Sequence, residues 1–187
     1  MRAIAGHLLR MLPYMAAALP LLAVWRFLAV KRLNRRGDAT TVWHEAGLLV
    51  FAMYLAGLAP QAFAPVSGGA GLSYNLVLFD VFRHGGGYLP INLIGNVAVF
   101  VPVGFFVPLL WRGGTLRRAL LAGACASLLL ELTQLPLGRC ADVDDLWTNT
   151  LGALVGYGLY RLLRVLSPPF TERCRTRRRA ETPLERN

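Results

Sequence analysis

The chain consists of long apolar runs separated by short polar segments, without the alternation of apolar and polar residues that is typical of strands. A helix of about 20 apolar residues is long enough to cross a hydrocarbon core of about 30 Å. The pattern therefore predicts an all-α, multi-pass protein of the cell membrane with five transmembrane helices. The predicted spans are Met11–Val30, Thr41–Ala59, Ile91–Leu110, Ala119–Leu137 and Leu146–Leu166.

The segments around the spans complete the predicted organisation. Residues 1–60 hold two helices joined by a basic loop, and residues 61–166 hold a core of three helices. Within that core, two glycine clusters bracket Asn75–Phe82, which is too short to cross a bilayer and predicts an interfacial or re-entrant segment. Residues 167–187 are polar and basic, and they predict a disordered tail.

The first apolar run has two interpretations. Arg2 and Arg10 precede it, as in a cleaved signal peptide. However, the run is long for a signal sequence, and a basic cluster follows it at once. These features favour a retained span.

Composition and charge placement exclude some classes of protein. Hydrophobic residues make up 55% of the chain and charged residues 16%, whereas soluble domains have about 25% charged residues. The net charge of +10 does not indicate nucleic-acid binding, because the basic residues lie beside the spans and no zinc-finger or RNP-type motif is present. Lysines and arginines concentrate on one predicted side of the membrane, so the N-terminus is predicted outside and the C-terminus in the cytoplasm.

Polar residues gather at the outer ends of three predicted spans. Asn92 and Asn96 share one face of the third span at i and i+4, and Glu131 and Gln134 share one face of the fourth. Polar side chains at membrane depth are costly and mark functional sites. The sequence therefore predicts an outward-facing binding cluster, whose members are Asn92, Asn96, Glu131, Gln134, Asp142, Asp144, Asp145 and Asn149.

Structural roles are the alternatives for the same residues. Asp144 or Asp145 is a suitable N-cap for the fifth span, and the asparagines can join helices by hydrogen bonds. Gly152 and Gly156 form a GxxxG face that predicts close helix packing and leaves a homodimer open. Glu131 needs a partner at its depth, for which Arg139 or a shared cation are the candidates.

Metal and cofactor chemistry have little support in the sequence. The spacing of Asp142, Asp144 and Asp145 does not match an EF-hand loop, so a metal site there is the weaker alternative. The three cysteines show no CxxC or metal-type spacing, and the predicted topology separates them, so they are predicted to be free thiols: Cys125, Cys140 and Cys174. No cofactor is predicted.

Three motifs, in this order and spacing, resemble the VanZ-like family. They are "NLIGNVAVFVPVGF" (Asn92–Phe105), "ELTQ" (Glu131–Gln134) and "DVDDLWTNTLGALVGY" (Asp142–Tyr157). "YNLVLF" (Tyr74–Phe79) is also similar, although the family often has proline where this chain has Leu78. The resemblance implies a small, multi-span bacterial membrane protein related to one associated with low-level teicoplanin resistance. It also implies that the polar residues above are the site.

Three functional hypotheses follow. The first is a binding protein of the cell envelope whose outer cluster contacts a cell-wall precursor, a lipid headgroup or a glycopeptide. The second is a membrane enzyme that modifies a lipid-linked molecule, with Glu131 or an aspartate as acid or base. The third is a scaffold whose polar groups only cap and join helices. No nucleophile motif such as G-x-S-x-G is present, which favours binding over catalysis.

Overall fold

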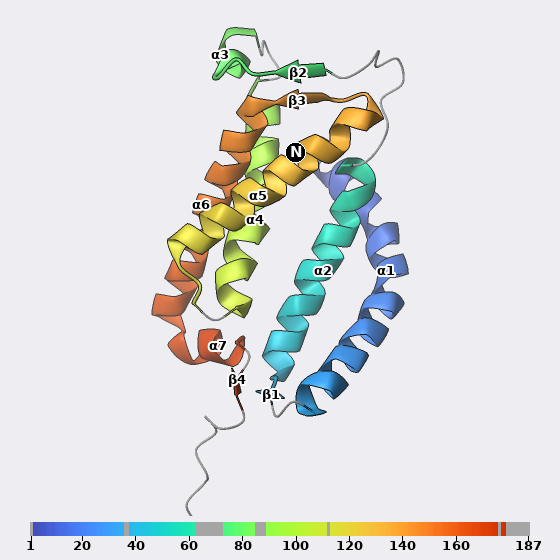
Figure 1. Ribbon diagram of the computed structural model, residues 1–187, viewed down its shortest axis with the longest axis vertical. Helices are drawn as coiled ribbons and strands as arrows, with labels where there is room; N and C mark the ends of the chain where they lie inside the picture. Colours follow the sequence, from blue (N-terminus) through green and yellow to red (C-terminus); the bar gives the residue numbers. More distant parts are fainter. Residues whose placement is uncertain are drawn as a thin grey trace, which may run out of the picture. The chain divides into compact units, whose positions relative to one another are not determined.

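The computed structural model describes residues 2–35, 38–62, 73–84, 89–111, 113–175 and 177–178. Long helices account for most of these residues (Figure 1). They are α1 (Arg2–Arg35), α2 (Val42–Ala62), α4 (Leu89–Leu110), α5 (Leu116–Gln134) and α6 (Val143–Leu166).

Short elements connect and flank these helices. They are β1 (Asp38–Ala39), β2 (Ser73–Asn75), α3 (Asp80–His84), the 3-10 helix η2 (Leu135–Leu137), β3 (Cys140–Asp142), α7 (Pro168–Arg173) and β4 (Arg177–Arg178). The strands form two small sheets, in which β1 pairs with β4 antiparallel and β2 pairs with β3 in parallel. The all-α expectation therefore holds for the long elements but missed these two pairings.

Four helical segments among the described residues are long and apolar enough to cross a membrane. They are Leu9–Arg35, Val42–Pro60, Leu93–Leu110 and Leu116–Leu137, and they confirm a helical fold of the membrane type. The predicted fifth span forms a helix, α6, but is not among the four, because Thr148, Asn149 and Arg161 lower its mean hydropathy. Five spans and the orientation of the termini stay predictions.

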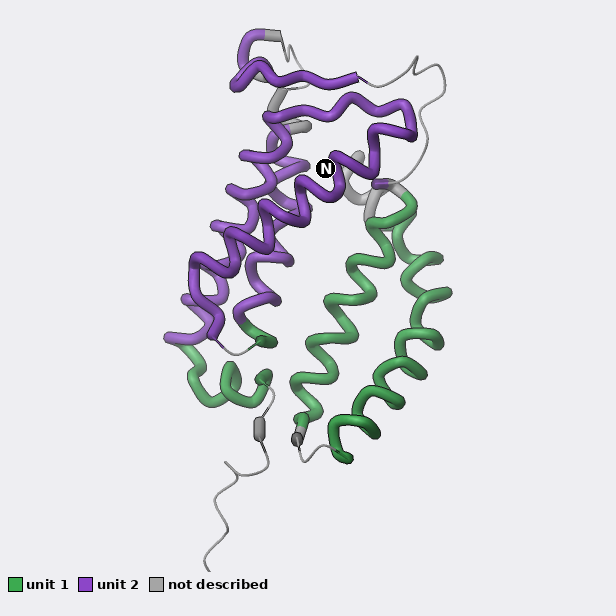
Figure 2. Tube along the Cα trace, viewed as in Figure 1, with its two compact units in different colours: residues 1–60, 109–112, 166–187 green, residues 61–108, 113–165 purple. Residues whose placement is uncertain are grey.

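The chain divides into two compact units (Figure 2). Unit 1 comprises residues 1–60, 109–112 and 166–187, and unit 2 comprises residues 61–108 and 113–165. Unit 2 therefore holds α5, most of α4 and α6, and both strands of the parallel sheet.

Glycines allow α6 to lie directly against α4 in unit 2. A Cβ atom added to Gly152 would lie 2.2 Å from the Val97 carbonyl oxygen, and one added to Gly156 would lie 2.0 Å from that of Val101. Gly104 of α4 contacts the Ala153 backbone in the same way. The sequence left open whether the GxxxG face forms a homodimer. In the structure this face contacts α4 of the same chain.

Unit 1 contains an ordered part of the segment that was predicted to be disordered. Residues 168–173 form α7, Thr171 is buried and Cys174 is buried. The His44 ring Nδ1 lies 2.8 Å from the Cys174 carbonyl oxygen, and the Trp43 ring packs edge-on against Phe170. The prediction of disorder is wrong here because these contacts with α2 hold the segment, and residues 179–187 lie outside the described ones.

Candidate functional site

The N-terminus of α6 is organised by Asp142, the last residue of β3. Its carboxylate accepts a hydrogen bond from the Asp144 backbone N–H at 2.8 Å, which is the N-cap interaction. The expectation that Asp144 or Asp145 provides the cap was therefore wrong: the helix begins at Val143, one turn earlier than the apolar run. The carboxylates of Asp144 and Asp145 instead contact other elements.

Glu131 lies near the end of α5 and is only 6% exposed. Its carboxylate accepts a hydrogen bond from the Asp142 backbone N–H at 3.1 Å, and this contact joins α5 to β3. Gln134, one turn further along α5, instead donates to the Ala62 carbonyl oxygen at 2.6 Å. The two residues that share a helix face in the sequence therefore serve different contacts.

Asp144 is 3% exposed and receives donors from two elements. The Phe79 backbone N–H donates to it at 2.6 Å, and the Trp147 indole N–H donates at 2.8 Å. Phe79 has a φ of 64°, which is uncommon for a residue with a bulky side chain. Its ring packs edge-on against Trp147, and Phe82 stacks on the same indole.

Asp145 faces α4 from the first turn of α6 and accepts a hydrogen bond from the Asn96 side-chain amide. Burial raises the pKa of the Asp145 carboxyl above its ordinary value, the negative charge of Asp142 adds to this rise, and the bond from Asn96 opposes it. The positive charge of Arg139 also lowers this pKa, so that arginine acts on the site from the loop before β3.

A strap formed by residues 73–84 lies beside these carboxylates at one end of unit 2 (Figure 1). The parallel pairing of β2 with β3 sets Asn75 opposite Asp142. The Asn75 side-chain amide donates to both Asp142 and Asp80, at 3.3 Å in each case. An interfacial or re-entrant segment was predicted over Asn75–Phe82, within the strap, and its place in the membrane stays a prediction; the pairing of β2 with β3 was not predicted.

We call Glu131, Asp142, Asp144 and Asp145 the acidic cluster. Of the remaining predicted site residues, Asn96 contacts this cluster directly. Asn149 donates to the Ser127 hydroxyl at 2.9 Å and joins α6 to α5, as Gln134 joins α5 to residue 62. Asn92 lies in α4, but its side chain is outside the described ones.

The acidic cluster is made of hydrogen-bond acceptors that partners from several elements contact. Its carboxylates are held by backbone N–H groups, an indole and amides, and within the described residues no group of three His, Cys, Asp or Glu side chains is arranged to hold a metal ion. Ionised carboxylates accept hydrogen bonds and attract cations. The cluster can therefore bind ammonium, amide or hydroxyl donors, or hold a proton.

Sequence reasoning missed the residues of the strap and one ion pair. Asn75 and Phe79 are separated from the aspartates by 67 and 65 positions. The glycine clusters and the resemblance of "YNLVLF" pointed to their segment, but neither pairs it with the aspartates.

The ion pair lies in unit 1, where two nitrogens of the Arg26 guanidinium, Nε and Nη2, donate to the Glu45 carboxylate at 2.7 and 2.8 Å.

The fold and its polar contacts define a helical membrane protein with a carboxylate-rich end. The chain belongs to the VanZ/LLP1 family, whose model matches residues 46–164. This region begins inside α2 and ends inside α6, so it contains the strap and the whole acidic cluster. No curated protein and no solved structure matches the chain.

Proposed function

We propose that this chain is a multi-pass protein of the bacterial cell membrane that lowers susceptibility to the glycopeptide teicoplanin. The acidic cluster faces outward and binds the antibiotic or a cell-wall precursor. The observation that carries this proposal is the convergence of carboxylates from α5, β3 and α6 at one end of unit 2. Membership of the VanZ/LLP1 family supports it.

The surroundings of the cluster suit a ligand that is both polar and apolar. Asp142 and Asp145 are half-buried and so retain surface for hydrogen bonds. Tyr74 of the strap is 70% exposed and Phe82 is 55% exposed. Glycopeptides and lipid-linked precursors combine hydroxyl, amide or amine donors with apolar groups. Carboxylates would accept from the donors while the aromatic rings contact the apolar part.

A structural scaffold is the second candidate, because protein donors already occupy much of the cluster. Phe79 and Trp147 donate to Asp144, and Asn96 donates to Asp145. If the cluster only stabilises the fold, replacing an aspartate by asparagine keeps an acceptor oxygen and preserves function. A binding or catalytic role requires the charge and is lost with the same replacement.

The test is antibiotic susceptibility in a host that lacks any relative. Cells express wild type, Glu131→Gln, Asp145→Asn or the control Glu172→Gln at matched membrane abundance. Glu172 is the control because it is an exposed carboxylate of α7, paired with Arg175. We expect wild type and the control to raise tolerance to teicoplanin and not to vancomycin, and both cluster variants to lose this effect. Full tolerance in both cluster variants favours the scaffold.

Catalysis is tested separately with the purified protein. Turnover of a lipid-linked envelope molecule that Glu131→Gln abolishes would assign an enzyme, with Glu131 as acid or base. The binding proposal instead expects no modified product and retention of the ligand by wild type alone.

A further inference from the structure

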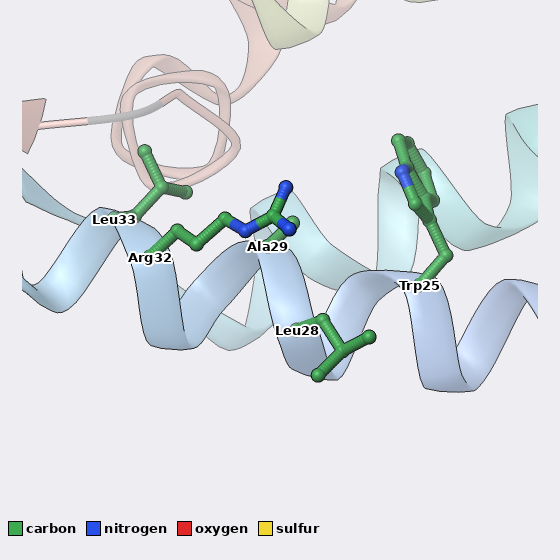
Figure 3. Close-up of a pocket in the computed structure, with 5 residues that line it drawn as sticks. All are labelled: Trp25, Leu28, Ala29, Arg32 and Leu33. Atoms are coloured by element: carbon green, nitrogen blue, oxygen red, sulfur yellow. The ribbon is translucent and has the colours of Figure 1, made fainter.

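One face of α1 forms a hollow at the basic end of the helix (Figure 3). Its lining residues follow helical spacing and are Trp25, Leu28, Ala29, Arg32 and Leu33. Four of these five side chains are apolar or largely apolar, and the fifth is a guanidinium. Trp25 is 53% exposed and Leu28 is 49% exposed. The segment Leu9–Arg35 contains a most apolar window of 18 residues, and no residue of that window is buried in the protein.

The direction of the Arg32 side chain distinguishes this hollow from an ordinary basic helix end. Basic residues in a last turn interact favourably with the C-terminal carbonyl groups of the helix. In Figure 3, however, the Arg32 side chain runs back along α1 over Ala29, in the direction of Trp25. Among the described residues, none forms an ion pair or hydrogen bond with Arg32. The guanidinium therefore lies over an apolar face, and no carboxylate among the described residues pairs with it.

The neighbouring contacts fix the rest of the hollow. The Arg26 guanidinium carbon lies 5.0 Å from the centre of the Trp25 ring, and Arg26 is itself held by Glu45. The charges of Arg26 and Glu45 thus cancel each other beside the hollow, whereas Arg32 has no ion pair with any residue that the structure describes. Lys31 and Arg35 add positive charge at the same end of α1.

We infer that this hollow binds one anionic phospholipid, with the lipid phosphate on Arg32 and an acyl chain along Leu28 and Trp25. The charge complementarity selects the occupant: a phosphate diester matches the fork of donors on a guanidinium, and only a lipid also supplies an apolar chain. Positive residues beside a span attract anionic lipid through the surface potential. A specific lipid site differs from this general attraction because binding depends on one arginine and one helix face.

The inference is tested with full-length protein in nanodiscs that contain brominated lipid. Bromine on an acyl chain quenches a tryptophan that it touches, and the Trp25 contribution is the difference in fluorescence between wild type and Trp25→Phe. We expect brominated phosphatidylglycerol to quench Trp25 more strongly than brominated phosphatidylcholine. Arg32→Gln should weaken the apparent affinity for phosphatidylglycerol by about tenfold or more, because it removes charge-assisted hydrogen bonds to the phosphate in addition to the general attraction of one basic side chain.

Lys31→Gln is the matched control, because it removes the same charge from the adjacent exposed position outside the hollow. We expect this variant to keep the preference for phosphatidylglycerol, and Arg32→Lys to retain part of it. Equal losses in Arg32→Gln and Lys31→Gln would overturn the inference in favour of diffuse attraction. Equal quenching by both lipids would also overturn it. Displacement of the brominated lipid by glycerol phosphate would assign the site to a free phosphate ester instead.

Discussion

The two units satisfy their buried charges in different ways. In unit 1 the Arg26 guanidinium and the Glu45 carboxylate form a bidentate pair, and the Thr40 hydroxyl donates to the same carboxylate at 2.6 Å. The side chains of Arg26 and Glu45 are 14% and 24% exposed. In unit 2 the carboxylates of the acidic cluster accept from backbone N–H groups, amides and an indole, and the positive charge of Arg139 acts on Asp145.

This difference separates a structural site from a candidate functional one. A bidentate pair has no net charge and little capacity for a further partner. Buried carboxylates that accept mainly from backbone and amide groups gain from a cationic or proton-donating ligand. The Arg26–Glu45 pair therefore joins α1 to α2, whereas the acidic cluster is the candidate for binding a further donor.

The largest expected effect comes from breaking the pair in unit 1. Arg26→Gln or Glu45→Gln leaves the other charge without its partner, so each should lower the free energy of unfolding by about 2–4 kcal/mol. The double variant should cost less than the sum of the single variants, because no charge is stranded. Unfolding of the purified protein in mixed micelles measures these values, and additive losses would show that the two residues do not interact.

The second largest loss of stability is expected from a substitution at the contact between α6 and α4. Gly156→Ala places a Cβ atom against the Val101 carbonyl oxygen, which should destabilise the protein by about 1–3 kcal/mol. Gly158→Ala is the control, because nothing lies within 4 Å of its added Cβ, and it should be neutral or stabilising. Equal destabilisation by both substitutions would contradict the close contact of the two helices.

Removal of the Asp144 acceptor should have a somewhat smaller effect. Asp144→Ala leaves the Phe79 and Trp147 donors without their acceptor and should cost about 1–2 kcal/mol. Asp144→Asn keeps an acceptor oxygen and should cost less. Trp147 fluorescence and thermal unfolding in detergent report the change. The prediction fails if the alanine variant is as stable as the asparagine variant.

The smallest effect concerns pH. Because the pKa of Asp145 is raised in the folded protein, the folded state holds the proton more tightly than the unfolded state. This contribution to stability is fully present below the ordinary pKa of an aspartate, and it is lost as the pH rises through the raised value. Asp145→Asn cannot titrate, so the difference in unfolding temperature between wild type and this variant should change as the pH rises above the ordinary pKa of an aspartate. A constant difference would contradict the shift.

The long helices could be predicted from the sequence because their apolar runs are continuous, and four of them meet the requirements for a span. The fifth, α6, illustrates the limit. It has the expected place, but its polar residues face neighbouring helices, as Asn149 does toward Ser127. The prediction of a disordered tail failed because composition does not show that Thr171 and Cys174 are buried in unit 1.

Some residues of the candidate site could also be predicted from the sequence. Glu131 and the aspartates lie at corresponding ends of successive helices, so their approach follows from an up-and-down topology. The partners of these carboxylates do not follow from it. Asn75 reaches Asp142 only through the pairing of β2 with β3, and the Arg26–Glu45 pair depends on how two helices face each other.

The most direct measurement compares Glu131→Gln with Glu45→Gln in one host, with teicoplanin tolerance and thermal stability read from the same membranes. We expect Glu131→Gln to lose tolerance while it keeps its unfolding temperature to within a few degrees, about what 1 kcal/mol would shift. Glu45→Gln should lose stability and retain tolerance per folded molecule. If Glu131→Gln keeps full tolerance, or if both variants lose tolerance only in proportion to lost folded protein, the acidic cluster is structural and the proposed function is wrong.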